Sequence, residues 1–330
     1  MKIKRRAVTA LIAMAFVGSV FLFALSLLRP PESDSRRFLS FSVEQGESYK
    51  SVSLRLKSEG LIRFEPFFYY VGRASGKSAS LKAGEYELNT EMSAWEILSV
   101  ITGSHVKLYR VTLREGINMF QVAQTLEDLG LVDKMQFLES CWDSQFLEEL
   151  HIPSPTVEGY LFPETYYIPR GSSPRAIIRI FVDMFWNRVP QSYIDEAKTG
   201  NLSFHEAVIM ASMIEKETGL VGEMAIISSA FYNRIDRRMK LQSDPTAVYD
   251  ILPLGGRVLR DHLFRKTAFN TYSIEGLPLT PISNPGILAI YAALHPQRTD
   301  YLYFVSRRDG SHHFSATFEE HKEAIEKYLK

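Results

Sequence analysis

The amino-acid sequence predicts an α+β protein with a single transmembrane helix at its N-terminus. Three observations lead to this prediction: an uncharged apolar run near the start, two copies of a strand–helix–strand–helix pattern, and a helix-rich C-terminal region. The 330 residues are enough for roughly two or three domains. An apolar fraction of 45% permits a sizeable core and excludes wholesale disorder.

The predicted membrane anchor is residues 7–28, which carry no charge and as a helix would span about 33 Å. Residues 1–6 are strongly basic, so they are expected to form a cytoplasmic tail and to direct the remaining chain outward. A cleaved signal peptide is the alternative, but the apolar run is long for one and lacks a small-x-small cleavage site. Residues 29–40 are predicted to form a polar linker.

Charge and cysteine content exclude several classes of function. The chain has 38 Lys and Arg against 38 Asp and Glu, so no broad basic face for nucleic acid is indicated. Cys141 is the one cysteine, which rules out an intrachain disulfide and a cysteine-built zinc site, and its apolar surroundings predict a buried small side chain. The adjacent His312 and His313 make a poor metal site. We therefore expect neither metal nor cofactor.

An internal duplication is visible in the glycine positions. Gly46 and Gly60 of one segment correspond to Gly116 and Gly130 of a later one, with matching apolar residues between them. Each copy is predicted to be a strand, a turn at the first glycine, and a helix that ends at the second. Both copies continue with another strand and helix.

The first copy lies in residues 41–104 and resembles LysM-type glycan-binding modules. A structural spacer that lifts the body off the membrane is the alternative interpretation. The second copy, residues 111–188, begins the region 105–330, in which residues 203–330 are predicted to carry the chemistry.

A helix is predicted from Phe204 to Thr218, with Ser203 as its N-cap. Glu215 falls on its apolar face, where burial should raise the carboxyl pKa and suit it to general acid catalysis. A glutamate that reaches water, or one paired with an arginine, is the ordinary alternative. Glu217 lies on the opposite flank of the same helix.

Two polar segments follow, residues 241–246 and 267–272. They combine amides, hydroxyls and aromatic rings, which suit a carbohydrate because rings stack on sugar faces while polar groups bond its alcohols. Taken singly, each segment is an ordinary turn.

Together these segments resemble the endolytic murein transglycosylases, the MltG-like or YceG-like family. The resemblance covers nearly the whole chain and rests on motifs that occur in the family's order: residues 158–166, 211–218, 241–246, 267–272, 284–286, 301–305 and 312–315. Two departures are Leu279-Thr280, where the family has a proline and a glycine, and Phe269, where a tyrosine is common.

The resemblance implies a lysozyme-like transglycosylase domain. Such enzymes are carbon–oxygen lyases that cleave the MurNAc–GlcNAc β-1,4 bond within peptidoglycan strands and leave 1,6-anhydro-MurNAc ends, here terminating or trimming nascent strands. One carboxyl group suffices, and by motif position it is Glu215, with Glu217 as the competing assignment. The residues implied to hold the glycan or to orient the acid are Gln242, Asp244, Thr246, Asn270 and Tyr272.

Two other functions stay open on the sequence. One is a non-catalytic, membrane-anchored glycan-binding scaffold, which would not need an acid on an apolar face. The other is a lysozyme-type hydrolase with Asp244 as its second carboxylate. The expected location is the inner membrane, with a single pass and an extracytoplasmic body. Peptidoglycan strands are the expected partner, and peptidoglycan synthases are candidate partners.

Overall fold

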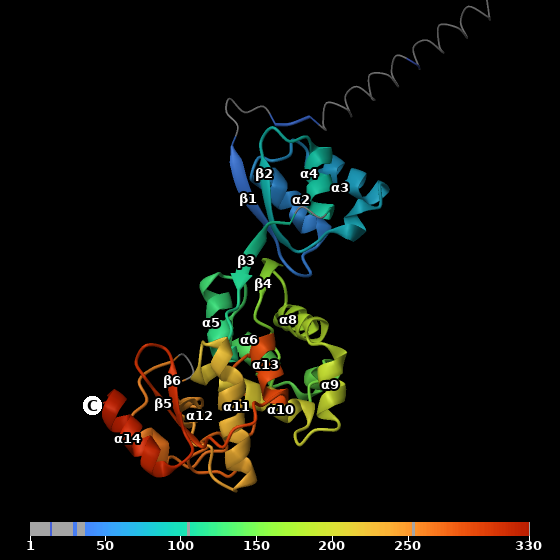
Figure 1. Ribbon diagram of the computed structural model, residues 1–330. Coiled ribbons are helices and arrows are strands. Elements are labelled where there is room, and N and C mark those ends of the chain that lie inside the picture. The colour runs from blue at the N-terminus through green and yellow to red at the C-terminus, as the bar shows by residue number, and fades with distance from the viewer. Residues whose placement is uncertain (1–13, 15–28, 32–36, 104–105, 253–254, 330) are drawn as a thin grey trace, which may run out of the picture. The chain divides into compact units, whose positions relative to one another are not determined.

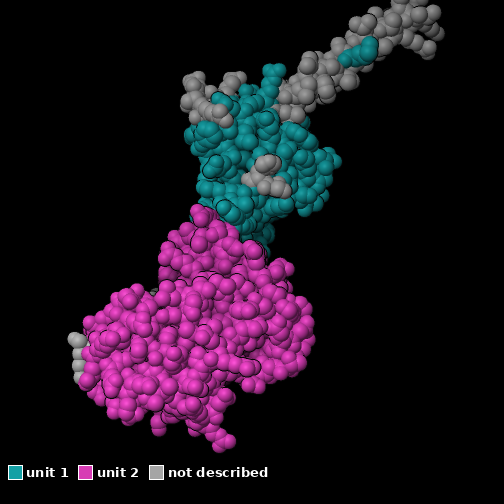
Figure 2. Space-filling view, in the orientation of Figure 1, with its two compact units in different colours: residues 1–109, 167–172 teal, residues 110–166, 173–330 magenta. Residues whose placement is uncertain are grey.

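A computed structural model describes residues 14, 29–31, 37–103, 106–252 and 255–329. The chain divides into two compact units, residues 1–109 with 167–172 and residues 110–166 with 173–330 (Figure 2). The predicted tail, and the predicted anchor apart from Met14, lie outside the described residues. Within the described ranges no helix has the length and apolarity needed to cross a membrane.

The first unit is a two-stranded antiparallel sheet with helices beside it (Figure 1). Phe41 of one strand pairs with Tyr86 of the other, and both side chains are buried. The elements in chain order are β1 (Phe38–Val43), α2 (Tyr49–Ser58), α3 (Glu65–Ala74), the 3-10 helix η1 (Lys77–Ser80), β2 (Gly84–Asn89) and α4 (Ala94–Thr102).

Local features of the sequence explain how the first unit folds. Inward residues of β1 alternate with outward ones, and they pack on Leu56 of α2 and Ile97 of α4 in one core. Gly46 makes the predicted turn at φ +79°, and Gly60 follows α2 at φ +74°. Both glycines adopt the left-handed conformation that the repeat pattern called for. The predicted strand–turn–helix arrangement of the first copy is therefore confirmed.

The second unit is mainly helical. Strands β3 and β4 pair in a two-stranded sheet of their own. The chain from β3 onward comprises β3 (Leu108–Thr112), α5 (Met119–Asp128), α6 (Lys134–Cys141), α7 (Ser144–Glu149), β4 (Thr165–Pro169), α8 (Pro174–Arg188), α9 (Gln191–Ala197), α10 (Phe204–Glu217), α11 (Val221–Asp236), α12 (Asp244–Val248), the 3-10 helix η2 (Arg260–Phe264), α13 (Ile287–Leu294), β5 (Tyr303–Ser306), β6 (His312–Ser315) and α14 (Phe318–Leu329). The α+β class predicted from the sequence is confirmed.

Helix α10 is the centre of this unit. It packs against α9, α11, α12 and α13, and every residue from Ala207 to Ile214 is buried. The sequence predicted one apolar face, whereas the helix is enclosed on all sides for two turns. Ser203 caps its start through a reciprocal bond with Glu206, as expected. The polar residues of α10 that could do chemistry are therefore confined to its C-terminal end.

Candidate active site

Two glutamates at the C-terminal end of α10 are directed toward different parts of the fold. Glu215 and Glu217 are two residues apart, so their side chains leave the helix about 200° apart. Both are partly buried. What surrounds each carboxyl group decides which of them can act as an acid on a bound glycan.

Glu217 meets the polar segment that follows Leu241. The Ser243 hydroxyl donates a hydrogen bond to Oε1 of Glu217 at 2.5 Å. Burial raises the pKa of Glu217 to about 7, although this hydrogen bond and the charges of His312 and Arg234 oppose the increase. A carboxyl group of this kind is protonated part of the time at neutral pH and can donate a proton.

The loop that carries Ser243 is fixed by a network of buried hydroxyls. The Thr246 and Thr271 hydroxyls bond each other at 2.8 Å, and the backbone N–H of Ser243 donates to Thr271 Oγ1 at 3.0 Å. The amide of Asn270 donates to the carbonyls of Leu263 and Arg265. The polar atoms of Thr246 and Asn270, two residues predicted to hold the glycan or orient the acid, are thus occupied by protein.

Three of the predicted residues, Gln242, Asp244 and Tyr272, are exposed or half-buried. The Tyr272 hydroxyl donates to Asp244 Oδ1 at 2.6 Å. Gln242 is exposed, has a left-handed backbone at φ +54°, and accepts from Arg234 at 3.3 Å. Strained backbone at a non-glycine residue is common at functional sites. Asp244 and Tyr272 interact electrostatically with Glu217, and Gln242 directly precedes Ser243 in the loop that bonds it.

Glu215 faces a different pair of loops. Its Oε2 accepts from the backbone N–H of Gly286 at 2.9 Å, and a Cβ atom at Gly116 would lie 3.5 Å from its Cγ. Burial raises its pKa, while the Gly286 hydrogen bond lowers it. Lys216, the next residue, donates to the Gly116 carbonyl at 3.1 Å. Within the described chain, none of the five predicted glycan-holding residues is hydrogen-bonded to Glu215.

One buried carboxyl group, which the sequence did not single out as functional, bonds the loop that contacts Glu215. Glu158 is 0% exposed and accepts from the Met119 N–H, the Tyr249 hydroxyl at 2.7 Å, and the Asn284 amide at 3.1 Å. Burial raises its pKa to about 7. Asn284 in turn accepts from the Gly159 N–H at 2.9 Å. The sequence signal for Glu158 was its place in the motif that contains Glu158-Gly159. The role of this carboxyl group is visible only in its contacts.

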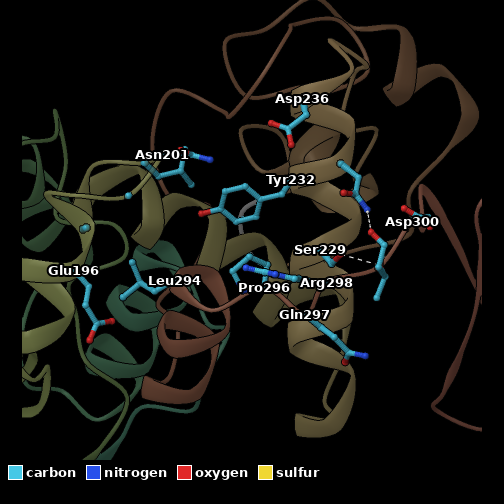
Figure 3. A pocket seen from close by; sticks show the side chains of 15 residues that line it. Glu196, Asn201, Ser229, Tyr232, Asp236, Leu294, Pro296, Gln297, Arg298 and Asp300 are labelled. Atoms are coloured by element: carbon cyan, nitrogen blue, oxygen red, sulfur yellow. Dashed lines mark hydrogen bonds between the residues drawn. The ribbon is translucent and has the colours of Figure 1, made fainter.

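A cavity of about 660 Å³ is lined by residues of α11 and by Leu294 at the end of α13 (Figure 3). Tyr232 extends across it, and Asn233 and Ser229 hold its wall through hydrogen bonds to Thr299. None of the residues predicted for the site lines this cavity. Likewise, the described ranges contain no group of three His, Cys, Asp or Glu side chains placed to hold a metal ion.

Comparisons with known proteins agree on one family. The model of the YceG-like family matches residues 41–327. The chain is 33% identical to the endolytic murein transglycosylase of Bacillus subtilis (strain 168), over 95% of this chain and 91% of that protein. It is 26% identical to the protein of the same name from Streptococcus pneumoniae serotype 2 (strain D39 / NCTC 7466), over 96% of this chain. It spans 64% of that streptococcal relative, less than two thirds of its length.

A solved structure extends the likeness to three dimensions. The crystal structure of a yceG-like protein from Listeria monocytogenes superposes with a TM-score of 0.61 at 29% identity. It covers 88% of this chain and 100% of the other. The motifs, the family match and this shared fold lead to one conclusion: the chain belongs to the YceG-like family.

Proposed function

We propose that this chain is an endolytic murein transglycosylase and that Glu217 is its acid and base. The relatives named for this activity support the enzyme class. The observation that carries the residue assignment is the hydrogen bond from Ser243 to Glu217, because it places that carboxyl among the polar segments predicted to hold a glycan.

The proposal differs from the sequence-based assignment of Glu215. Glu217 has a pKa near 7 and lies beside the accessible groups of Asp244 and Tyr272. Glu215 is instead bonded to the Gly286 backbone and close to Gly116. We assign Glu215 the role of joining α10 to these two loops.

The reaction uses one carboxyl group twice. Protonated Glu217 donates its proton to the glycosidic oxygen as the bond from MurNAc C1 to that oxygen breaks. The C6 hydroxyl of the same MurNAc then attacks C1 and gives its proton to the Glu217 carboxylate, which restores the acid. This attack is intramolecular and gains the high effective molarity of a tethered nucleophile. The product ends in 1,6-anhydro-MurNAc, and no water is consumed.

Hydrolysis is the competing chemistry within the same site. It would require a second carboxylate to activate water, and Asp244 is the nearest candidate. In the described structure Asp244 accepts a hydrogen bond from the Tyr272 hydroxyl, which supports a role in holding or orienting groups. Digestion of peptidoglycan in ¹⁸O-water separates the two: a transglycosylase leaves unlabelled anhydro ends, whereas a hydrolase incorporates label at the new MurNAc end.

We further propose that residues 7–28 anchor the enzyme in the inner membrane with its body outside the cytoplasm. The uncharged run preceded by a tail with four basic residues and no acidic one supports this orientation. The same proposal takes the first unit as a LysM-like glycan-binding module and peptidoglycan synthases as candidate partners. A reporter fused after Lys330 should be active outside the cytoplasm, and activity confined to the cytoplasm would contradict the topology.

A further inference from the structure

A buried guanidinium holds the segment that leads into the loop beside Glu217. Arg234 lies in α11 and is 8% exposed. Its Nε donates to the Leu302 carbonyl at 2.6 Å, and its Nη1 donates to the carbonyls of Lys240 at 3.0 Å and Leu241 at 2.9 Å. Because these acceptors come from two separate segments of the chain, they fix the guanidinium in one position.

The same guanidinium sets the orientation of the side chain that follows Leu241. Nη1 of Arg234 also donates to Oε1 of Gln242 at 3.3 Å. A guanidinium carries donors and no acceptor, so the Gln242 amide must present its oxygen to Arg234, and its NH2 group points elsewhere. Among the described residues, none accepts a hydrogen bond from this NH2 group. The donor end of the Gln242 amide is therefore the end that a ligand can meet.

The backbone of Gln242 is held as firmly as its side chain. The residue has a left-handed φ of +54°, and its N–H donates to the Thr271 carbonyl at 3.2 Å. Such a conformation persists in a non-glycine residue only where the surrounding structure imposes it. Ser243, the next residue, bonds Glu217. An exposed amide on a constrained backbone is thus one residue away from the group that bonds the proposed acid.

We propose that Arg234 is a positioning residue that orients Gln242 so that its NH2 group donates a hydrogen bond to the carbonyl oxygen of a 2-acetamido group of the glycan. The proposal rests on the function proposed above and names the group of the substrate that this residue binds. Sugar hydroxyls both donate and accept, so either end of a freely rotating amide could bond them. A carbonyl oxygen only accepts, so it requires the NH2 end that Arg234 leaves free.

A purely structural tie between α11 and the loop is the competing explanation for Arg234. It predicts that variants lose activity in proportion to the folded protein and treat all glycan strands alike. The informative quantity is therefore the ratio of kcat/KM for native strands to kcat/KM for chemically de-N-acetylated strands. The fraction of folded enzyme cancels in this ratio. Any effect of the missing acetyl group on the chemistry itself cancels when variants are compared with wild type.

The test measures this ratio for the full chain in detergent. Gln242→Ala should lower the ratio by about three- to tenfold relative to wild type, because one hydrogen bond to a neutral acceptor is lost on native strands alone. Arg234→Lys should lower it similarly, since an ammonium group cannot hold two carbonyls and an amide in the geometry of a guanidinium. The double variant should lower the ratio no further than either single variant, because the two residues act as one unit.

Two exposed residues of the same types supply matched controls. Arg237 is the C-cap of α11, and Gln297 lines the cavity that contains none of the predicted site residues (Figure 3). Arg237→Lys and Gln297→Ala should both keep the wild-type ratio.

Gln242→Glu tests the orientation of the amide directly. Glutamate keeps the shape of the side chain and an oxygen for Arg234, and it replaces the NH2 group by a second oxygen. We expect KM for native strands to rise at least as much as in Gln242→Ala. A wild-type KM in Gln242→Glu would show that an oxygen of this side chain faces the glycan and would overturn the inference.

An unchanged ratio in Gln242→Ala would also overturn it. If Arg234→Lys fails to fold, the two variants of the exposed Gln242 still decide between the outcomes. Glu217→Gln, measured alongside, separates this failure from that of the proposed function. If Glu217→Gln stays active, the acid assignment itself has failed. If Glu217→Gln is inactive and Gln242→Ala keeps the wild-type ratio, only the role of Arg234 and Gln242 is lost.

Discussion

The Ser243 hydroxyl donates to Oε1 of Glu217 at 2.5 Å and thereby joins the end of α10 to the loop before α12. This bond stabilises the charged carboxylate and opposes the effect of burial on its pKa. It also explains why the polar residues that follow Leu241 gather at one of the two glutamates.

Ser243→Ala should raise the pKa of Glu217 from its value of about 7, because the hydrogen bond that favours the carboxylate is removed. We expect the alkaline limb of the pH profile of kcat to move to higher pH, because the protonated form of Glu217 then persists to higher pH. The measurement is kcat against pH. Ser273→Ala is the control, since the Ser273 hydroxyl bonds only the Asn270 carbonyl among the described groups. An equal effect in both variants would contradict a specific role for Ser243.

Glu158 should make the second unit less stable as pH rises. Its folded-state pKa of about 7 exceeds its usual value of 4.5, so the folded state binds the proton more tightly than the unfolded state. This contribution is fully present below pH 4.5 and is lost as pH rises to 7, by up to about 3 kcal/mol.

Glu158→Gln removes the titration, so its free energy of unfolding should depend less on pH between 4.5 and 7 than that of wild type. Urea unfolding at several pH values measures the difference. Glu164→Gln, at a partly exposed ion pair with Arg188 in the same motif, is the control and should keep the wild-type slope. Equal slopes in wild type and Glu158→Gln would refute the buried-carboxyl explanation.

Gly159→Ala should destabilise the protein by about 2–4 kcal/mol. Gly159 has φ +88°, and a Cβ atom there would lie 2.5 Å from Pro281 Cγ and 3.0 Å from Val208 Cγ1. Gly276 has a similar φ of +73° but open space around it, so Gly276→Ala should cost only about 1 kcal/mol. Thermal or urea unfolding of the two variants tests this. Equal losses of stability in the two variants would mean that backbone strain alone explains the effect and that the close contacts with Pro281 and Val208 contribute nothing.

Local features of the sequence predicted local structure well. Ser203 caps the start of α10 as expected, and the helix ends at Glu217, one residue before the predicted end. The glycines of the repeat sit at the turns and helix ends assigned to them. Cys141 is buried as predicted, and burial raises its pKa well above the usual range. These features depend on residues within a few positions of one another, where capping and backbone preference dominate.

The site could be predicted only in part, because its geometry depends on distant contacts. Helical periodicity placed Glu215 on the apolar face, but α10 is enclosed on all sides, so periodicity could not separate it from Glu217. The contact from Ser243 that distinguishes them crosses 26 residues of sequence. Thr246 and Asn270 had the residue types of a sugar site, yet their polar atoms bond the protein. His312 was set aside as a poor metal ligand, and the 2.7 Å contact of its Nδ1 with Glu223 was not visible in the sequence.

The most direct test of the central claim is product analysis with the two glutamate variants. Peptidoglycan digested by the full chain, by Glu217→Gln and by Glu215→Gln is examined by mass spectrometry for fragments that end in 1,6-anhydro-MurNAc. Gln keeps the shape of Glu but cannot supply a proton, so we expect Glu217→Gln to lose about 10²–10⁴ in rate while remaining folded. Glu215→Gln should still release anhydro ends. Anhydro products from Glu217→Gln at the wild-type rate, with none from Glu215→Gln, would contradict the account and return the acid to Glu215.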